Sequence, residues 1–171
     1  MKKILCSLFL FLVPLVANAG RPEMGFFKTI SEKTGTARAI VRLYPCGANM
    51  CGRIVALFND AGTAIQETIR NPQKRADKVK DNPFVDGLDI IWGMTWNDRN
   101  ARYDGGRIMD PEDGATYSAR IWTDDADPTI LNVRGSIGPF GRTQTWHAVA
   151  ESDLPKELHN LDTSGWTLIT R

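Results

Sequence analysis

The alternation of short strands and turns between residues 103 and 146 constrains the fold of this chain more than any other feature of its sequence. Residues 110–114 read D-P-E-D-G, where the proline presets φ and the glycine accepts a positive φ, so the chain turns there. Polar and apolar residues alternate over 116–121, which is the period of a half-buried strand. Further turns follow at 124–128 and 138–141, with no helical stretch between them. The pattern predicts a meander of antiparallel strands that closes on itself.

Similar segments fill most of the remaining chain. Residues 37–44 alternate in the same way, and 52–58 form a largely apolar run. Residues 87–96 carry the greatest concentration of large apolar side chains outside the N-terminal segment, with Leu88, Ile90, Trp92, Met94 and Trp96 expected on one face. About eight strands and no convincing long helix before residue 151 predict an all-β fold. We expect a single antiparallel up-and-down β-barrel, whose interior is either filled or holds one small ligand.

The first 19 residues predict an exported protein. A short basic start is followed by an apolar run and by the small residues Ala17-Asn18-Ala19, as in a signal peptide cleaved after Ala19. A membrane anchor is the alternative, but the apolar run is shorter than the ~20 residues that span a bilayer. We therefore expect a periplasmic or secreted protein, with the barrel domain at 20–150. A C-terminal tail at 151–171 is either docked or disordered.

The charge balance argues against several partners. The chain has 21 Lys and Arg against 20 Asp and Glu, so losing Lys2 and Lys3 leaves 19 basic residues and a net charge of about −1. No strong field attracts nucleic acid, so no nucleic-acid partner is expected. An outer-membrane barrel needs an apolar outward face. Here one face is polar, which favours a soluble barrel without a membrane span after signal cleavage; its polar residues are Arg38, Arg42, Arg120, Asn132 and Arg134.

Two cysteines remain after signal cleavage, Cys46 and Cys51, in an exported and oxidising setting. Four residues separate them, and a four-residue hairpin loop brings two such side chains within disulfide reach. The alternatives are half of a metal site or a redox pair. A metal site needs more ligands, and only His147 and His159 are available, without paired spacing. Redox enzymes usually carry C-x-x-C, which is absent. We favour a structural disulfide and expect no metal.

The chain resembles a family of exported bacterial proteins known as domain-of-unknown-function family 2147, over about residues 25–149. Its order and spacing of motifs carry the resemblance: Cys46 with Cys51-Gly52-Arg53-Ile54-Val55, Asn71-Pro72 with Arg75, Gly87-Leu88, Gly105-Gly106-Arg107-Ile108, Asp110-Pro111, Gly114 with Tyr117, Val133 with Gly135, and Gly141-Arg142-Thr143-Gln144-Thr145-Trp146. The resemblance implies an exported, lipocalin-like barrel with a small ligand of undefined identity, and no established activity. The chain departs from the family pattern at Phe27, Tyr103, Met109 and Ala148. The last of these stands where the family often has an arginine, which removes an expected contact at the barrel end.

No catalytic constellation is evident, so we expect neither an enzyme nor a cofactor. The serine-nucleophile motif G-x-S-x-G is absent. Asp104, Asp110 and Asp113 lie at turn positions, where aspartate caps its own backbone. His147 follows a tryptophan in a strand and is expected to point outward.

The aromatic residues are the best candidates for a ligand site. Their alternative role is plain core filling, whereas binding requires a cavity with apolar walls and a few polar groups. Our leading hypothesis is a barrel that binds a small apolar or amphipathic molecule without catalysis. The alternative is a filled barrel that contacts a protein or the cell envelope, whose identity is unknown, through residues 68–86 and the tail. The expected ligand-binding residues are Trp92, Trp96, Tyr117, Arg142, Gln144 and Trp146.

Overall fold

The computed structural model describes residues 21–22 and 24–169, so the predicted signal peptide lies outside the described part of the chain. The described residues form nine β-strands and two short 3-10 helices. The strands are β1 (Phe26–Ile30), β2 (Ala37–Cys46), β3 (Asn49–Phe58), β4 (Ile65–Thr68), β5 (Asp89–Asn97), β6 (Arg102–Met109), β7 (Thr116–Thr123), β8 (Ile130–Ile137) and β9 (Phe140–Val149). The helices are η1 (Glu151–Asp153) and η2 (Lys156–Leu158).

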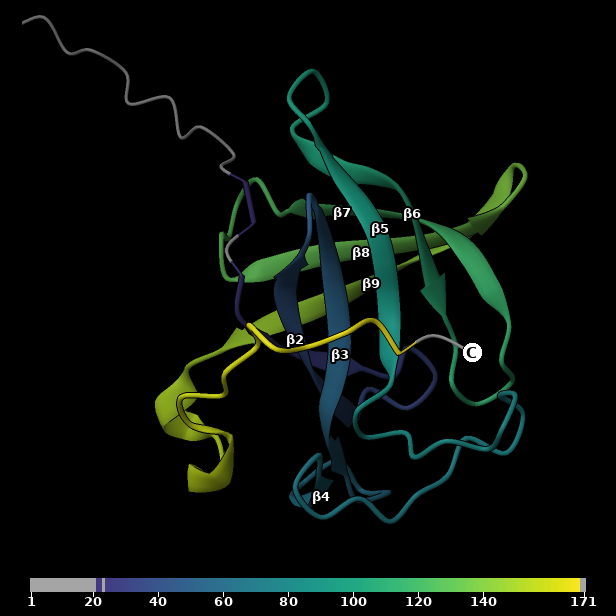
Figure 1. Cartoon of the computed structure of the whole chain (residues 1–171). Helices are drawn as coiled ribbons and strands as arrows, with labels where there is room; N and C mark the ends of the chain where they lie inside the picture. The colour runs from purple at the N-terminus through teal and green to yellow at the C-terminus, as the bar shows by residue number, and fades with distance from the viewer. Residues whose placement is uncertain (1–20, 23, 170–171) are drawn as a thin grey trace, which may run out of the picture.

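Eight of the strands close a barrel through antiparallel pairing. Figure 1 shows the barrel from the side of β2, β3 and β5. The order around the barrel is β1, β2, β3, β5, β6, β7, β8 and β9, and β9 pairs with β1 to complete the ring. β4 lies outside the ring, paired with the end of β3. The predicted all-β, up-and-down barrel of about eight strands is confirmed. No helix among the described residues has the length and apolar character needed to cross a bilayer.

The main hydrophobic core takes side chains from each of the eight barrel strands. Antiparallel strands that pack one face inward produce this arrangement from the alternating pattern of the sequence. The core residues contributed by the strands in order include Phe27, Val41, Ile54, Ile91, Tyr103, Ile121, Val133 and Trp146, all at most 5% exposed.

Two glycines interrupt the alternation of β5 and β6. Gly93 and Gly105 have φ of +69° and +77°, a backbone conformation that other residues rarely adopt. Ile91 and Trp96 both pack against the main core, although five positions separate them, so the strand changes face between them. Trp92, next to Ile91, pairs with the exposed Arg107 and also packs against the main core from a half-buried position. The five residues expected on one apolar face all belong to this core or pack against it, and so does Ile91 from the other set of alternating positions.

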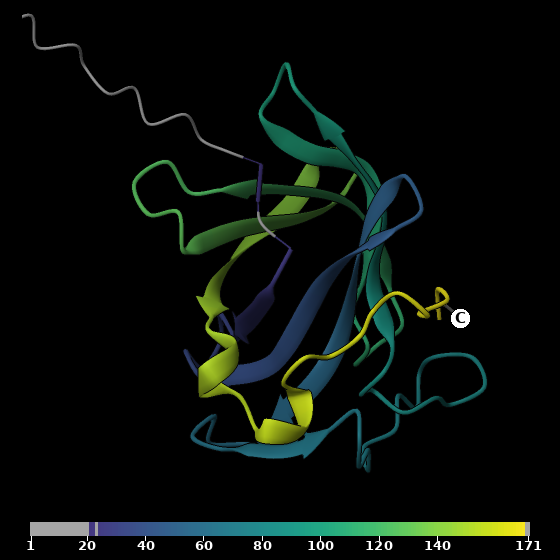
Figure 2. The same ribbon diagram turned by 60° about the vertical axis from the view of Figure 1, so that its left-hand side comes forward.

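A second hydrophobic core lies outside the barrel wall. Phe26, Ile40 and Val55 of β1, β2 and β3 pack against Leu154 and Leu158 of the tail. Figure 2 shows the tail crossing this side of the barrel after the two 3-10 helices. Residues 151–169 thus cover an apolar patch that the outward faces of three strands leave exposed.

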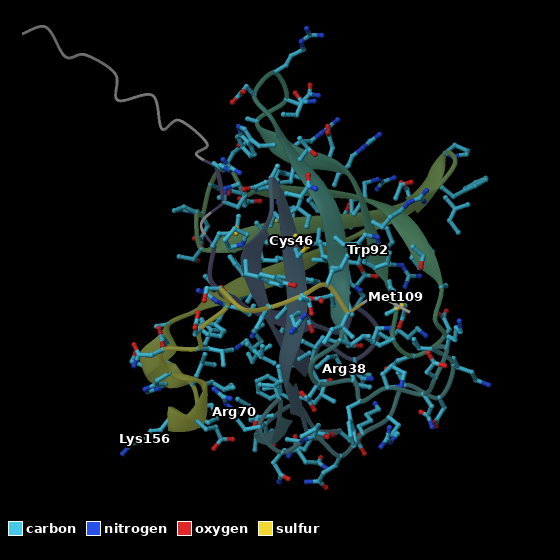
Figure 3. The ribbon with its side chains drawn as sticks, viewed as in Figure 1. Arg38, Cys46, Arg70, Trp92, Met109 and Lys156 are labelled. Carbon is cyan, nitrogen blue, oxygen red and sulfur yellow. A yellow bond between two sulfur atoms is a disulfide. The ribbon has the colours of Figure 1, made fainter. Side chains whose placement is uncertain are left out.

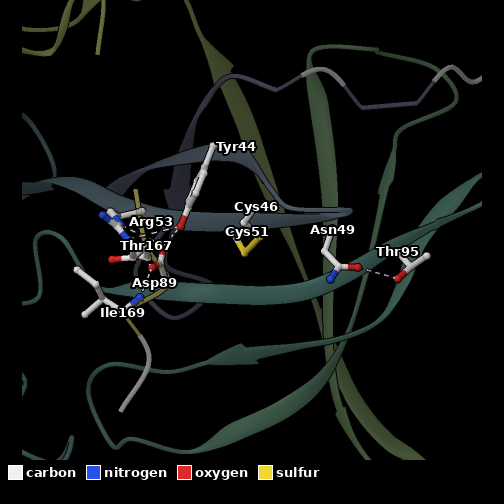
Figure 4. Close-up of a disulfide and its surroundings, with 9 residues drawn as sticks. All are labelled: Tyr44, Cys46, Asn49, Cys51, Arg53, Asp89, Thr95, Thr167 and Ile169. Carbon is white, nitrogen blue, oxygen red and sulfur yellow. Dashed lines mark hydrogen bonds and ion pairs between the residues drawn. A yellow bond between two sulfur atoms is a disulfide. The ribbon is translucent and has the colours of Figure 1, made fainter. Parts of the chain in front are cut away.

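Cys46 and Cys51 form a disulfide across the β2–β3 hairpin, close to the turn (Figure 4). Pairing of Cys46 with Asn49 and of Tyr44 with Cys51 fixes the register of this hairpin. The predicted disulfide is present, but the loop between the strands is the two residues Gly47 and Ala48, and not the four that were expected.

Residues 69–88 form the long connection between β4 and β5. Its apolar side chains Ala76, Val79 and Val85 belong to the main core. The carbonyl oxygen of Lys78 lies so close to the turn at Gly114 that a Cβ there would be 2.7 Å from it. The connection therefore packs against the β6–β7 turn and covers that end of the barrel.

Candidate ligand site at the barrel mouth

The opposite end of the barrel, which we call the mouth, carries the β2–β3, β5–β6 and β7–β8 turns. The described residues before β1 cross it, and we call these residues (21, 22, 24 and 25) the N-terminal strap (Figure 2). Pro22 of the strap is buried and Met24 packs against the main core. The carbonyl oxygen of Gly25 accepts a hydrogen bond of 2.8 Å from the backbone N–H of Leu43. The strap is thus tied to β2 at one end.

The strap places a cation against two aromatic rings. The rings of Trp96 and Tyr103 meet edge to face, with centroids 5.2 Å apart. The guanidinium carbon of Arg21 lies 5.1 Å from the Tyr103 centroid and 5.9 Å from that of Trp96. Arg21 Nε also donates a hydrogen bond to the Tyr103 hydroxyl. These distances are within the range of cation–π attraction, so the mouth binds a positive group supplied by its own chain.

The rim beside Trp96 is polar and partly acidic. Trp96 Nε1 donates a hydrogen bond of 2.7 Å to Asp98 Oδ1. Asp104 pairs with Arg102 at 3.3 Å. A shallow, open hollow lies here, lined by Thr95, Trp96, Asn97, Asp98, Arg99, Asn100 and Asp104. The mouth thus combines aromatic faces with oxygen acceptors.

Strand pairing places Trp96 and Gln144 in one row of inner-wall residues. Each member of the row pairs with the next across adjacent strands, in the order Trp96, Tyr103, Ile121, Val133 and Gln144. Trp146 lies beside this row, is 1% exposed, and donates a hydrogen bond of 3.2 Å from Nε1 to Gln144 Oε1. The polar end of Gln144 therefore already has a partner within the barrel.

The remaining predicted ligand residues lie elsewhere. Tyr117 pairs with Ile108, nearer the opposite end, and is half-buried. Arg142 is largely exposed and forms a salt bridge of 3.1 Å with Glu32 in the β1–β2 turn. Trp92 of β5 is half-buried, pairs with Arg107 and packs against the main core (Figure 3). The structure therefore places Trp96, Gln144 and Trp146 on the inner wall, with Gln144 and Trp146 in contact and Trp96 four strands away, and places the other three elsewhere.

Sequence reasoning missed Tyr103 and Arg21 at the mouth. Tyr103 is fully buried, yet as a lone aromatic in a short strand it looks like any core residue. Arg21 follows the predicted signal peptide and carries no local pattern. The strap reaches the mouth because β1, which follows it, pairs with β9.

Sequence reasoning also missed a buried ion pair on the outer wall. Arg53 and Asp89 form a salt bridge of 2.6 Å with side chains 5% and 0% exposed. Asp89 also accepts hydrogen bonds from the Tyr44 hydroxyl and from the backbone N–H of Ile169, at 2.8 and 2.6 Å. Arg53 donates to the carbonyl oxygen of Thr167 at 2.6 Å (Figure 4). We call this group the tail clamp, because it holds residues 166–169 against β3 and β5.

Trp166 completes the tail clamp with its aromatic ring. The Arg53 guanidinium carbon lies 4.3 Å from its centroid, and its ring meets that of Tyr44 edge to face at 4.9 Å. Burial, together with the hydrogen bond to Asp89, raises the pKa of Tyr44 far above its ordinary value. Tyr44 therefore acts as a neutral hydrogen-bond donor, and the clamp has no evident reactive group.

The comparisons with known proteins agree with this architecture. Residues 25–148 match the family model described as "Uncharacterized protein conserved in bacteria (DUF2147)". A solved structure from Helicobacter pylori, described as protein HP1028 belonging to the lipocalin family, is similar with a TM-score of 0.57. It is 15% identical and aligns with 76% of this chain and 84% of its own. This likeness shows a lipocalin-like fold. No curated protein matches the chain.

Proposed function

The chain belongs to the family of uncharacterized proteins conserved in bacteria (DUF2147), and from that premise we propose that it is an exported barrel that binds a small amphipathic molecule at its mouth without catalysis. One observation carries the proposal: the Arg21 guanidinium lies against the rings of Trp96 and Tyr103. A segment of the chain itself makes the contacts that a cationic ligand group would make. The lipocalin-like fold supports the same class of function, because barrels of this size accommodate one small ligand.

The barrel interior limits how such a ligand binds. Tyr103, Ile121 and Val133 in the inner row are at most 1% exposed, so this layer is already filled by side chains. Space for a ligand arises where the strap now lies, above Trp96. We therefore propose that the ligand replaces the strap, with its apolar part in the place of Pro22 and Met24 and its cationic or hydrogen-bond-donating group on the aromatic pair.

The polar groups of the rim indicate which chemical class of ligand the mouth would bind. Asp98 and Asp104 line the adjoining hollow, and both offer carboxylate oxygens to a donor. An organic cation with an apolar tail matches the acceptors and the aromatic faces better than a fatty acid does.

The alternative function, contact with a protein or the envelope through residues 68–86 and the tail, has weaker support. Leu154 and Leu158 of the tail are at most 6% exposed, so these groups are already occupied by the barrel wall. Val79 and Val85 of the 68–86 segment are at most 5% exposed and belong to the main core. These apolar groups are therefore not free to bind a partner.

Native mass spectrometry of residues 20–171, purified from the periplasm without detergent, tests the proposal. We expect a stoichiometric adduct that disappears on denaturation and whose mass identifies the ligand. Trp96→Ala should lose the adduct, whereas Trp122→Ala, a half-buried tryptophan in β7, should retain it. An adduct retained equally by both folded variants would contradict a site at the mouth.

A second variant tests whether the strap competes with the ligand. Arg21→Ala removes the internal cation, so we expect tighter binding, by about fivefold to tenfold for a contact worth about 1 kcal/mol. Titration with a quaternary-ammonium amphiphile, monitored by tryptophan fluorescence, measures the change. Lys28→Ala, a basic residue of β1, is the matched control. Weaker binding by Arg21→Ala would mean that Arg21 belongs to the site instead of occupying it.

A further inference from the structure

The turn between β8 and β9 exposes an apolar tip, residues 137–140, which we call the hairpin tip. Ile137 and Phe140 are 63% and 81% exposed and pair with each other across the strands. Gly138 and Pro139 between them are also exposed, so all four residues of the tip are apolar and accessible. Figure 1 shows this hairpin projecting from the barrel. Burying this surface requires a partner outside the barrel.

Arginines without an internal partner lie behind the tip. Arg120 of β7 and Arg134 of β8 are directly opposite each other. Like charges at opposed positions destabilise a sheet, so the fold gains nothing from this pair. Among the described residues no acidic group lies within salt-bridge distance of Arg120, Arg134 or Arg107. We call these three residues the arginine wall.

Neighbouring acidic groups do not cancel the arginine wall. Glu32 is paired with Arg142, and Glu112 in the β6–β7 turn is paired with Arg38. Arg134 itself donates only a hydrogen bond of 3.3 Å, to the Thr143 hydroxyl. The charge of the wall therefore remains available to an external anion.

The distance between the hairpin tip and the arginine wall matches the depth between the acyl chains and the phosphates of a bilayer. Ile137 lies three residues beyond Arg134, and Arg120 lies opposite Arg134 on the next strand. At about 3.3 Å per residue these two arginines lie about 10 Å behind the tip. Interfacial segments bury their apolar groups about 5–10 Å into the boundary between head groups and acyl chains. The guanidinium groups would then lie at the depth of the lipid phosphates.

We propose that the hairpin tip inserts into the surface of a bilayer that contains anionic lipids, with Arg120 and Arg134 binding head-group phosphates. The exposed apolar tip and the unpaired charge wall are independent observations that require the same occupant. An acidic protein would satisfy the arginines but gives no reason for an apolar tip at the end of a hairpin. A second copy of the chain would cover the tip, but it would also bring the arginine walls of the two copies close together, where their like charges repel.

Co-sedimentation of residues 20–171 with vesicles tests the proposal. We expect binding to vesicles of phosphatidylcholine with 30 mol% phosphatidylglycerol (about one anionic lipid in three), and loss of binding to pure phosphatidylcholine and at 1 M salt. Ile137→Ser with Phe140→Ser should weaken binding at least tenfold. Arg120→Gln and Arg134→Gln should each weaken it about fivefold, the effect of one basic residue near an anionic surface.

Matched controls distinguish this site from general surface effects. Leu168→Ser changes another exposed apolar residue, 47% exposed, and Lys156→Gln changes a basic residue on the tail, away from the tip (Figure 3). Both should bind as the unaltered protein does. A nitroxide attached to Phe140→Cys should be immobilised by anionic vesicles and shielded from water-soluble relaxing agents.

Three results would overturn the proposal. The first is equal binding to neutral and anionic vesicles. The second is a tip variant that is folded, by circular dichroism, and still binds fully. The third is a nitroxide that stays accessible to water-soluble relaxing agents and whose mobility falls as protein concentration rises. This result would identify the tip as a contact between copies of the chain.

Discussion

Asp86 is the residue whose environment most alters its acid–base chemistry. Asp86 is 4% exposed to solvent. Neither of its carboxylate oxygens has a hydrogen-bond partner among the described residues. Glu67 nearby accepts hydrogen bonds from the backbone N–H groups of Gln73 and Lys74, at 2.6 and 2.7 Å. Burial first, and the charge of Glu67 second, raise the pKa of Asp86 to about 7, against a smaller opposing effect of Lys74.

This raised pKa predicts how stability depends on pH. The folded protein holds the Asp86 proton up to about pH 7, whereas the unfolded chain releases it near the ordinary value of 3.8. Unfolding thus releases a proton between these values, and the free energy of unfolding falls as pH rises from about 4 to about 7. The difference of about three between the folded and unfolded pKa of Asp86 limits this loss of unfolding free energy to about 4 kcal/mol. Asp86→Asn should remove this slope and be more stable at pH 8.

Urea unfolding at pH 4, 6 and 8 measures this effect. Asp113→Asn, an exposed carboxylate in the β6–β7 turn, is the control and should keep the slope of the unaltered protein. If the curves of Asp86→Asn and the unaltered protein run parallel, the Asp86 carboxyl is already ionised throughout this range.

The tail clamp gives a second prediction for single residues. Arg53→Met leaves the Asp89 carboxylate buried without its cation, which typically costs about 3–5 kcal/mol. Arg53→Met combined with Asp89→Leu removes both charges and should cost less than Arg53→Met alone. Urea unfolding of the three proteins measures the difference. A double variant less stable than Arg53→Met would show that the remaining clamp contacts depend on Asp89 itself.

At the scale of strands and loops, the local features were predictable and the distant ones were not. The D-P-E-D-G turn and the Cys46–Cys51 hairpin involve neighbours in sequence, so turn chemistry and alternation were sufficient to predict them. The face switch depends on Gly93 and Gly105 acting together in adjacent strands. Either glycine alone looks like an ordinary strand glycine, so the sequence does not predict that Ile91 joins the same core as its neighbours.

The candidate site was only partly predictable for the same reason. Trp96, Gln144 and Trp146 were predicted because large aromatics and the polar residues beside them are unusual in short strands, and their part in binding stays a prediction. Their partners Arg21 and Tyr103 are 82 residues apart, and no local pattern links them. Asp89 likewise depends on Arg53, 36 residues earlier, and on the tail.

The packed tail predicts different costs for two leucines within it. Leu158 is 0% exposed in the outer core, whereas Leu168 is 47% exposed. Leu158→Ala should lower the free energy of unfolding by about 2–5 kcal/mol. Leu168→Ala should change it by less than about 0.5 kcal/mol. Thermal and urea unfolding measure both. Equal, small effects would mean that the tail contributes little to stability.

At the scale of the whole molecule, closure of the barrel depends on its shortest barrel strand. β1 has five residues and lies between β2 and β9. Its pairing with β2 is local, but Phe26 pairs with Val149 at the other end of the barrel sequence. The mouth, the strap and the outer core all depend on this seam, because each includes residues next to β1. Ligand binding that displaces the strap would therefore act next to the seam that closes the barrel.

This topology predicts the order of folding. The β5–β8 meander forms from local hairpins, whereas the β1–β9 seam must close a loop of more than 100 residues. Phe27→Ala at the seam should mainly accelerate unfolding, with φ near 0–0.3. Ile121→Ala in the meander should mainly slow folding, with φ of about 0.5–0.8. Both side chains belong to the main core and are at most 5% exposed, so both variants lose enough stability for φ to be measured. Stopped-flow chevrons of the disulfide-intact protein give both values, with folding expected in milliseconds to seconds. A high φ for Phe27 with a low φ for Ile121 would mean that the seam forms first and the meander assembles on it.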